Sequence, residues 1–196
     1  MDILEAIVII PALGKRGPFA DTLTKNLAGI PLIKRAIIQA LMIAKQSRIH
    51  VVTDSDEVEL ICERSNISLL TISNWRSKYG EFAKDSSQTI IFFSPFFPLL
   101  EMHEIISAFS IFQKNEQKIL VPVVRSRTQI QNSGEELNRQ QQFFNVAGKQ
   151  TVLITSSSFR ILSPSLLIDS TDLSNEESCY FELQTEPIEI DRPQDW

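Results

Sequence analysis

The chain has 196 residues, 43% of them hydrophobic, which is enough apolar material for one domain with a buried core. Its 19 basic and 24 acidic residues give a formal charge of −5, and a chain without excess cations is poorly suited to neutralise a nucleic-acid backbone. The longest apolar run, Ile90–Leu100, is broken by one serine and two prolines and falls well short of the roughly 20 residues that span a bilayer. We therefore expect a single domain over residues 1–196, with neither nucleic acid nor membrane as a partner.

The amino terminus and the cysteines indicate the compartment. Asp2 and Glu5 stand where an export signal carries basic residues, and the apolar stretch behind them is short. The two cysteines, Cys62 and Cys179, are far apart in sequence and have no metal-binding spacing, so we expect both to be buried, reduced thiols. These features predict a cytoplasmic protein.

The first part of the chain alternates apolar strands with amphipathic helices. Ala6–Ile10 is a short β-branched run, typical of a strand that is buried on both faces. From Pro31 onwards apolar residues recur at helical spacing, and proline suits the first turn of such a helix. Ile49–Val52 predicts a second strand, after which Asp54 or Ser55 can cap a helix whose first turn is acidic.

This alternation continues through the middle of the chain. Ser68–Ile72 and Thr89–Phe93 predict two more strands, the apolar stripe of Met102–Phe112 predicts a helix, and Lys118–Val124 predicts a fifth strand. Strands that alternate with helices are joined by crossovers, which produce a mainly parallel sheet. The predicted fold class is therefore α/β, a three-layer, Rossmann-like, doubly wound sheet.

The last third of the chain is less regular. Residues from about 125 to 150 form a polar excursion, which we interpret as a loop or hairpin. Strand character returns at Thr151–Thr155, and Ser156–Ser158 is interpreted as a turn or cap because it lacks the G-x-S-x-G context of a nucleophilic serine. The final predicted element is Cys179–Leu183.

The loop after the first strand is the first place to look for chemistry. Ligands of open α/β sheets bind beyond the carboxyl ends of the strands. This loop, Pro11–Asn26, carries two glycines and three cations, a composition that lets the backbone approach a polyphosphate while lysine and arginine neutralise it. It has neither the Walker spacing nor G-x-G-x-x-G, so the pattern alone also fits an ordinary basic surface loop.

Several segments, taken in order, resemble motifs of the sugar-acid cytidylyltransferases, and most closely those of the CMP-N-acetylneuraminate synthetases. That family carries I-P-A-R-G-G-S-K, then K-N-L and G-x-P-L-I, then S-T-D-[DS], Q-P-T-S-P-L and finally D-I-D-T-P-E-D. The segments that are similar to these motifs are Ile9–Ala12, Lys25–Leu27, Ala28–Ile33, Val52–Asp56, Ser94–Leu99 and Glu189–Asp195.

The resemblance implies a nucleotide-diphospho-sugar transferase-like fold and a transfer of CMP from CTP. A hydroxyl of a 2-keto sugar acid, of the sialic-acid type, would attack the α-phosphate and release pyrophosphate, with Mg²⁺ as cofactor and a homodimer as the assembly. Catalysis would rest on Lys25 and Asp191, with Asp191 and Glu189 as the metal ligands. Nucleotide-binding residues would be Ala12, Leu13, Gly14, Lys15, Arg16, Lys25 and Asn26, and the acceptor sugar would contact Ser94 and Asn145.

The chain also departs from the family motifs, and two functions stay open. Leu13 replaces the arginine after I-P-A, Glu189 replaces the first aspartate of the last motif, and Ser94 replaces a glutamine expected at the sugar. An enzyme of this family with a different acceptor is one reading. The other is a catalytically impaired homologue that acts as a binding partner in a surface-glycan pathway.

Overall fold

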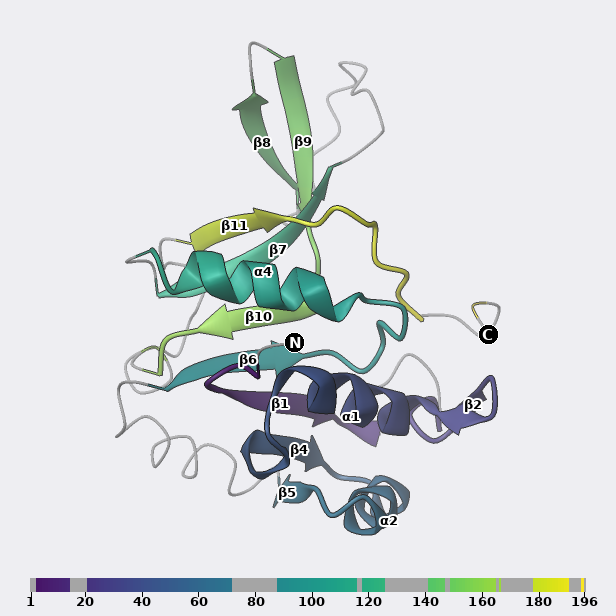
Figure 1. Cartoon of the computed structure of the whole chain (residues 1–196). Helices are drawn as coiled ribbons and strands as arrows, with labels where there is room; N and C mark the ends of the chain where they lie inside the picture. Colours follow the sequence, from purple (N-terminus) through teal and green to yellow (C-terminus); the bar gives the residue numbers. More distant parts are fainter. Residues whose placement is uncertain are drawn as a thin grey trace.

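A mixed β-sheet forms the centre of the described structure, a computed structural model that covers residues 3–14, 21–71, 88–115, 118–125, 141–146, 149–164, 166, 178–190 and 195 (Figure 1). For 71, 141–146 and 149–152 only the backbone is described. Nine described strands join in the order β5-β4-β1-β6-β10-β7-β9-β8, with β11 paired to β7. Their bounds are β1 Ala6–Ala12, β4 Ile49–Thr53, β5 Ser68–Thr71, β6 Thr89–Phe93, β7 Ile119–Arg125, β8 Gln141–Val146, β9 Lys149–Thr155, β10 Phe159–Leu162 and β11 Ser178–Glu182.

The amino-terminal part of the sheet is parallel. β1 lies between β4 and β6, runs parallel to both, and β5 extends the parallel order on the outer side of β4. Ala6–Ile10 is buried throughout, which explains why this strand is continuously apolar instead of alternating. The carboxyl ends of these strands therefore share one edge of the sheet.

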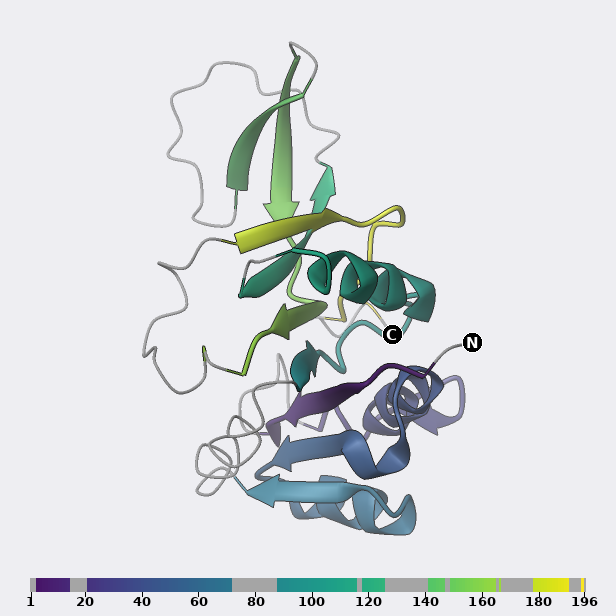
Figure 2. The ribbon, with the colours of Figure 1, turned by 60° about the vertical axis from the view of Figure 1, so that its left-hand side comes forward.

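The second part of the sheet is mixed. β10 runs antiparallel to both β6 and β7, so it stands between the two parts of the sheet in reversed direction. β8 and β9 form an antiparallel hairpin that continues from β7 and projects from the body of the sheet (Figures 1 and 2). β11 pairs with β7 in parallel.

Within the described residues, three helices cover one face of the sheet. These are α1, Leu32–Ile43, α2, Asp56–Arg64, and α4, Met102–Phe112. The apolar side chains of all three join β1 and β4 in one core cluster. A smaller cluster of Ile7, Ile9, Val52, Leu70 and Ile90 lies on the opposite face of the parallel strands. Three short elements complete the description: β2, Asn26–Leu27, β3, Ile30–Pro31, and a 3-10 turn, Gln46–Arg48.

The predicted α/β, Rossmann-like fold class is confirmed, since the parallel strands β1, β4, β5 and β6 alternate with helices as the sequence pattern requires, although the rest of the sheet is mixed. The prediction that both thiols are buried is wrong for one of them: Cys62 on α2 is fully buried, whereas Cys179 on β11 is only partly covered, like the residues beside it at the start of that strand. No helix in the described part of the chain is long and apolar enough to cross a membrane.

Candidate functional site

The carboxyl edge of the parallel strands brings together the segments that the sequence singled out. Ala12, the last residue of β1, pairs in register with Thr53, the last residue of β4. Ser94 follows the end of β6 at the same edge because β6 is parallel to β1. Loops that are far apart in the sequence therefore begin side by side.

Two hydrogen bonds fix the start of the first loop to the end of β4. The backbone N–H of Gly14 donates to Oδ1 of Asp54 at 2.7 Å, and the hydroxyl of Thr53 donates to the carbonyl of Ala12 at 2.7 Å. A Cβ on residue 14 would lie 3.1 Å from Cβ of Ser55, so glycine is what allows this close approach. The Asp54 carboxylate thus holds the loop, while Ser55 caps α2 by accepting from the N–H of Val58.

Leu13 has an apolar environment. Its side chain is half-buried and packs against the cluster of Ile7, Ile9, Val52, Leu70 and Ile90, on the face of the parallel strands opposite α1, α2 and α4. An apolar side chain at position 13, where the resembled family carries arginine, therefore fits the apolar contacts that this residue makes. The neighbouring predicted residues Lys15 and Arg16 lie outside the described part of the chain.

Lys25 and Asn26 lie exposed at the base of a tight hairpin that leads into α1. The hairpin pairs β2 with β3, and its two turn residues, Ala28 and Gly29, have positive φ values of 48° and 81°. The Arg35 guanidinium of α1 donates to the carbonyl of Leu27 at 2.8 Å and holds this turn against the helix. Sequence periodicity places Arg35 on the polar side of α1 and gives no signal for this role.

The first N–H groups of α1 and the first turn of α2 are already engaged. Leu32 donates to the carbonyl of Lys25, and Ile33 donates to the carbonyl of Leu23. The first turn of α2 carries three acidic side chains besides its serine cap. A phosphate at this edge would therefore be held by loop backbone and side chains, because neither helix start offers its full set of donors.

Ser94 shapes the turn after β6. Its N–H donates to the carbonyl of Ser158 at 2.9 Å, and its hydroxyl accepts from the N–H of Phe96 at 3.4 Å. Phe97 is buried and Phe96 packs against the same core, so the aromatic residues that follow Ser94 are part of the protein interior. For the second predicted sugar contact, Asn145 in β8, only the backbone is described.

The C-terminal segment, which we define as residues 183–190, is tied back to this edge. The N–H groups of Gln184 and Thr185 both donate to Oε1 of the buried Glu104, at 2.9 and 3.2 Å. The N–H of Ile190 donates to the carbonyl of Phe96 at 2.9 Å. Glu189 is thereby placed next to the turn after β6, whereas Asp191 lies outside the described residues.

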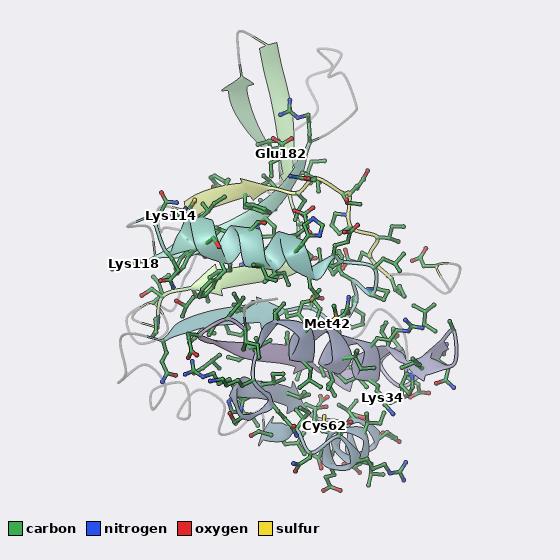
Figure 3. The ribbon with its side chains drawn as sticks, in the orientation of Figure 1. Lys34, Met42, Cys62, Lys114, Lys118 and Glu182 are labelled. Atoms are coloured by element: carbon green, nitrogen blue, oxygen red, sulfur yellow. The ribbon has the colours of Figure 1, made fainter. Side chains whose placement is uncertain are left out.

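The beginning of this segment is also joined to the sheet. The N–H of Leu183 donates to the carbonyl of Val123. Just before it, Glu182 at the end of β11 accepts two hydrogen bonds from Arg125 at the end of β7, at 2.7 and 2.9 Å (Figure 3). The guanidinium lowers the pKa of the Glu182 carboxyl, and the carboxylate raises the pKa of Arg125.

A pocket of about 230 Å³ opens between the turn after β9, the end of β7 and the C-terminal segment. It is lined by Phe97, Val124, Thr155, Ser156, Ser157, Arg160, Glu186, Pro187 and Glu189. Its polar groups are hydroxyls, two carboxylates and one guanidinium. Sequence reasoning identified Glu189 and missed Arg160, because an isolated arginine in a short apolar strand carries no motif. Within the described residues, no three side chains of the metal-binding types gather into a cluster.

Comparison with known proteins identifies the fold. No protein-family model and no curated protein matches the sequence. Among solved structures, the chain is similar to a CMP:2-keto-3-deoxy-manno-octonic acid synthetase complexed with CTP, with a TM-score of 0.73 and 12% identity over 98% of this chain and 95% of that one. It is also similar to a 4-diphosphocytidyl-2C-methyl-D-erythritol synthase, with a TM-score of 0.67 and 10% identity over 97% and 94% of the two chains.

A third similar structure is HddC from Yersinia pseudotuberculosis, with a TM-score of 0.62 and 14% identity over 96% of this chain and 95% of that one. The same protein has also been solved in complex with GMP-PN. At such identities the similarity establishes the fold, which this chain shares with cytidylyltransferases over nearly its whole length.

Proposed function

We propose that this protein is a nucleotidyltransferase that moves CMP from CTP to a hydroxyl of a 2-keto sugar acid and releases pyrophosphate. The observation that carries the proposal is the meeting of three separate segments at one sheet edge: Leu13–Gly14, the turn that begins at Ser94, and the C-terminal segment with Glu189. The motif resemblance supports the same reaction, and so does the CTP named for the similar synthetase.

Nucleotidyl transfer depends mainly on neutralising the charge of the phosphates and on aligning the reacting groups, and it needs little covalent catalysis by the protein. In this proposal the glycine of the first loop lets the backbone approach the phosphates, and Lys15, Arg16 and Lys25 neutralise them. Asn26 holds the nucleotide. These residues would keep the α-phosphate facing the acceptor hydroxyl, so that the pyrophosphate leaves on the opposite side.

The oxygen donors at this edge fit Mg²⁺. Glu189 lines the pocket beside a second carboxylate and several hydroxyls, a donor set of hard oxygens without imidazole or thiolate. We propose that Glu189 and Asp191 hold the ion, which would offset the negative charge that develops on the phosphates. Mg²⁺ is commonly held by one or two carboxylates together with substrate phosphates, so a large protein cluster is not required.

The assembly and the compartment are proposals as well. We propose a homodimer formed through α1, because Ile38, Leu41 and Met42 lie at helical spacing and are each at least 40% exposed. The exposed Leu99 lies on the adjoining loop, which Gln39 of α1 holds through the carbonyls of Pro98 and Leu100. Two free thiols suit the reducing cytoplasm.

One observation favours a second candidate function, that of a catalytically impaired homologue acting as a binding partner in a surface-glycan pathway. Leu13 is packed among apolar side chains and can neutralise no phosphate. If the remaining cations do not compensate for it, the protein would keep the fold without binding a nucleoside triphosphate.

The two candidates are separated by thermal unfolding with CTP, UTP, GTP and ATP, each with and without Mg²⁺. A ligand at 100 times its Kd adds about 2.7 kcal/mol, which should raise the Tm of a chain of this size by about 5–10 °C. We expect that rise for CTP with Mg²⁺ alone. A rise with GTP instead would change the nucleotide, and no rise with any nucleotide would favour the binding-partner function.

A variant pair makes this test specific to the site. Lys25→Ala should abolish the rise with CTP, because it removes a cation from the proposed phosphate site. Lys114→Ala is the matched control, since Lys114 follows the carboxyl end of α4 at the opposite edge of the sheet (Figure 3). Equal effects of the two substitutions would contradict the assignment of Lys25.

A further inference from the structure

Residues 94–100, which we call the bridge loop, leave the end of β6 and lead towards α4. The loop begins at the candidate site, because Ser94 follows β6 at the carboxyl edge of the parallel strands. Towards its other end Leu99 is 62% exposed, although Pro98 and Leu100 on either side of it are buried. The bridge loop therefore runs from the candidate site to an apolar side chain at the surface.

Gln39 of α1 fixes the bridge loop around Leu99. Its side-chain nitrogen, Nε2, donates to the carbonyl of Pro98 at 3.2 Å and to the carbonyl of Leu100 at 3.1 Å. An amide nitrogen has two protons, and these two acceptors stand on either side of Leu99. The position of Leu99 therefore depends on α1 as well as on the loop itself.

Gln39 also borders the exposed apolar residues of α1. Met42 lies four positions after Ile38 and three after Gln39, so these side chains are neighbours on the helix surface. Ile38, Leu41 and Met42, which we call the α1 surface, carry no charge, and neither does Leu99 beside them. A two-fold dimer brings the same surface of two copies together, so an uncharged surface meets no like charge there.

The other end of the bridge loop is attached to the candidate site. The N–H of Ser94 donates to the carbonyl of Ser158 at 2.9 Å, and the carbonyl of Phe96 accepts from the N–H of Ile190 at 2.9 Å. The second hydrogen bond places Glu189, the proposed metal ligand, beside the pocket. A displacement of the bridge loop would therefore also displace the backbone that carries Glu189.

We infer that the bridge loop couples dimer formation to the geometry of the candidate site, with Gln39 as the positioning residue. A second copy that covers the α1 surface and Leu99 restricts the loop, and the restricted loop holds Glu189 in place for Mg²⁺ and the nucleotide. The inference rests on the proposed function and on its homodimer. Because coupling is reciprocal, each bound Mg²⁺–CTP strengthens the dimer by the factor by which dimer formation strengthens its binding.

The first experiment measures the dimer dissociation constant by analytical ultracentrifugation, with and without CTP and Mg²⁺. The variant is Gln39→Ala. The matched control is Gln46→Ala, since Gln46 also donates through one amide nitrogen to two backbone carbonyls, those of Ser65 and Asn66 after α2. CTP with Mg²⁺ should strengthen the dimer about five-fold or more in the wild type and in Gln46→Ala. Gln39→Ala should lose most of this effect.

The second experiment uses amide hydrogen exchange, measured by NMR without nucleotide. It compares the wild type with the double variant Ile38→Lys and Met42→Lys, which places two charges on the α1 surface. The amide protons of Ser94 and Ile190 should exchange about ten-fold or more faster in the double variant, because the loop that fixes their hydrogen bonds is released. The amide proton of Leu183, which is bound to β7, is the internal control and should change little.

The same exchange measurement on the glutamine variants tests the role of Gln39. Gln39→Ala should speed exchange at Ser94 and Ile190 as the double variant does, whereas Gln46→Ala should leave both rates unchanged. A uniform increase that includes Leu183 would show a general loss of stability and would contradict a positioning role.

The two experiments separate this inference from the proposed function. A monomeric wild type, or equal exchange at Ser94 and Ile190 in the wild type and the double variant, would overturn the inference. A CTP-induced rise in Tm without any change in the dimer constant would also overturn it, and the proposed function would stand. If CTP causes no rise in Tm but the exchange difference is found, the loop coupling is supported and only the proposed function is contradicted.

Discussion

At the scale of single residues, Asp54 connects the end of one strand to the loop of another. Its carboxylate accepts the N–H of Gly14 at 2.7 Å, in a partly buried place where the backbone donor has no other described partner. The motif resemblance draws attention to this aspartate, yet helix-capping rules assign it to α2 as readily as Ser55. The packing of β1 beside β4 decides that Asp54 binds the N–H of Gly14 and that Ser55 caps α2. The local sequence carries no signal for this packing.

The first prediction follows from that hydrogen bond. Asp54→Ala should lower the free energy of unfolding by about 1–3 kcal/mol, because the N–H of Gly14 loses its charged acceptor. Asp54→Asn keeps an acceptor oxygen and should lose less. Urea unfolding monitored by tryptophan fluorescence or circular dichroism measures both, and equal stability of wild type and Asp54→Ala would contradict a fixed first loop.

The second prediction concerns Cys62. Burial raises the pKa of its thiol from 9.0 to about 11, and the nearby charge of Glu59 adds to this rise. The folded protein therefore keeps the thiol proton at a pH where the unfolded chain has lost it. The contribution of the Cys62 thiol to the free energy of unfolding is fully present below pH 9. It decreases as the pH rises from 9 towards 11, by at most about 1.4 kcal/mol per pH unit. Cys62→Ala should show a shallower alkaline decrease in urea unfolding than the wild type, and parallel curves would contradict the raised pKa.

At the scale of elements, Glu104 of α4 is the anchor of the C-terminal segment. Helical periodicity places this acidic residue in the first turn of a helix, where it would be expected to face water. In the structure it is 2% exposed, because residues 183–190 return across the end of α4 and present two N–H groups to Oε1. A contact across 80 residues of sequence has no local signal.

The third prediction is that Glu104 positions Glu189 without touching the substrates. Glu104→Ala should destabilise the protein by about 2–3 kcal/mol, because two donors lose their acceptor, and should raise the Mg²⁺ concentration needed for the CTP-induced rise in Tm. Glu104→Gln keeps the carbonyl oxygen and should behave nearly as the wild type does. A loss of stability without a changed Mg²⁺ requirement would leave Glu104 as a purely structural residue.

The elements themselves show which features a sequence pattern reveals. β1, β4 and β6 are continuous apolar runs and the helices have clear stripes, so the parallel part of the sheet was predictable. β10 was not predicted, because its four residues follow a serine turn closely and include Arg160. β8 begins within a polar stretch, and its strand state depends on pairing with β9.

At the scale of the whole molecule, the exposed apolar residues of α1 are unusual for a helix that also covers the core. Met42 and Lys34 lie near opposite ends of α1 (Figure 3), and the exposed set Ile38, Leu41 and Met42 continues towards the carboxyl end. The last turn of α1 carries no basic side chain. The apolar stripe in the sequence predicts the position of this helix. Which of its apolar residues lie on the outer side can be recognised only when the structure shows which side is buried.

The fourth prediction tests the proposed dimer through this surface. The wild type should sediment as a dimer at micromolar concentration, and the double variant Ile38→Lys and Met42→Lys should sediment as a monomer with unchanged circular dichroism. Leu60→Lys on α2 is the control, since Leu60 is equally exposed, at 51%, but lies on another helix. A monomeric wild type would contradict the dimer, and a dimeric double variant would place its interface elsewhere.

The reversed strand β10 also has a consequence for how the protein is made. It is the strand that, among those described, links the parallel part of the sheet to β7, since β6 pairs with β1 on one side and β10 on the other. On a ribosome that adds about 5–20 residues per second, β6 waits several seconds until residues 159–162 have been synthesised. During that time its open edge, which is rich in isoleucine and phenylalanine, is available to other nascent chains. Synthesis at low temperature or with chaperones that cover apolar edges should therefore raise the yield of soluble protein.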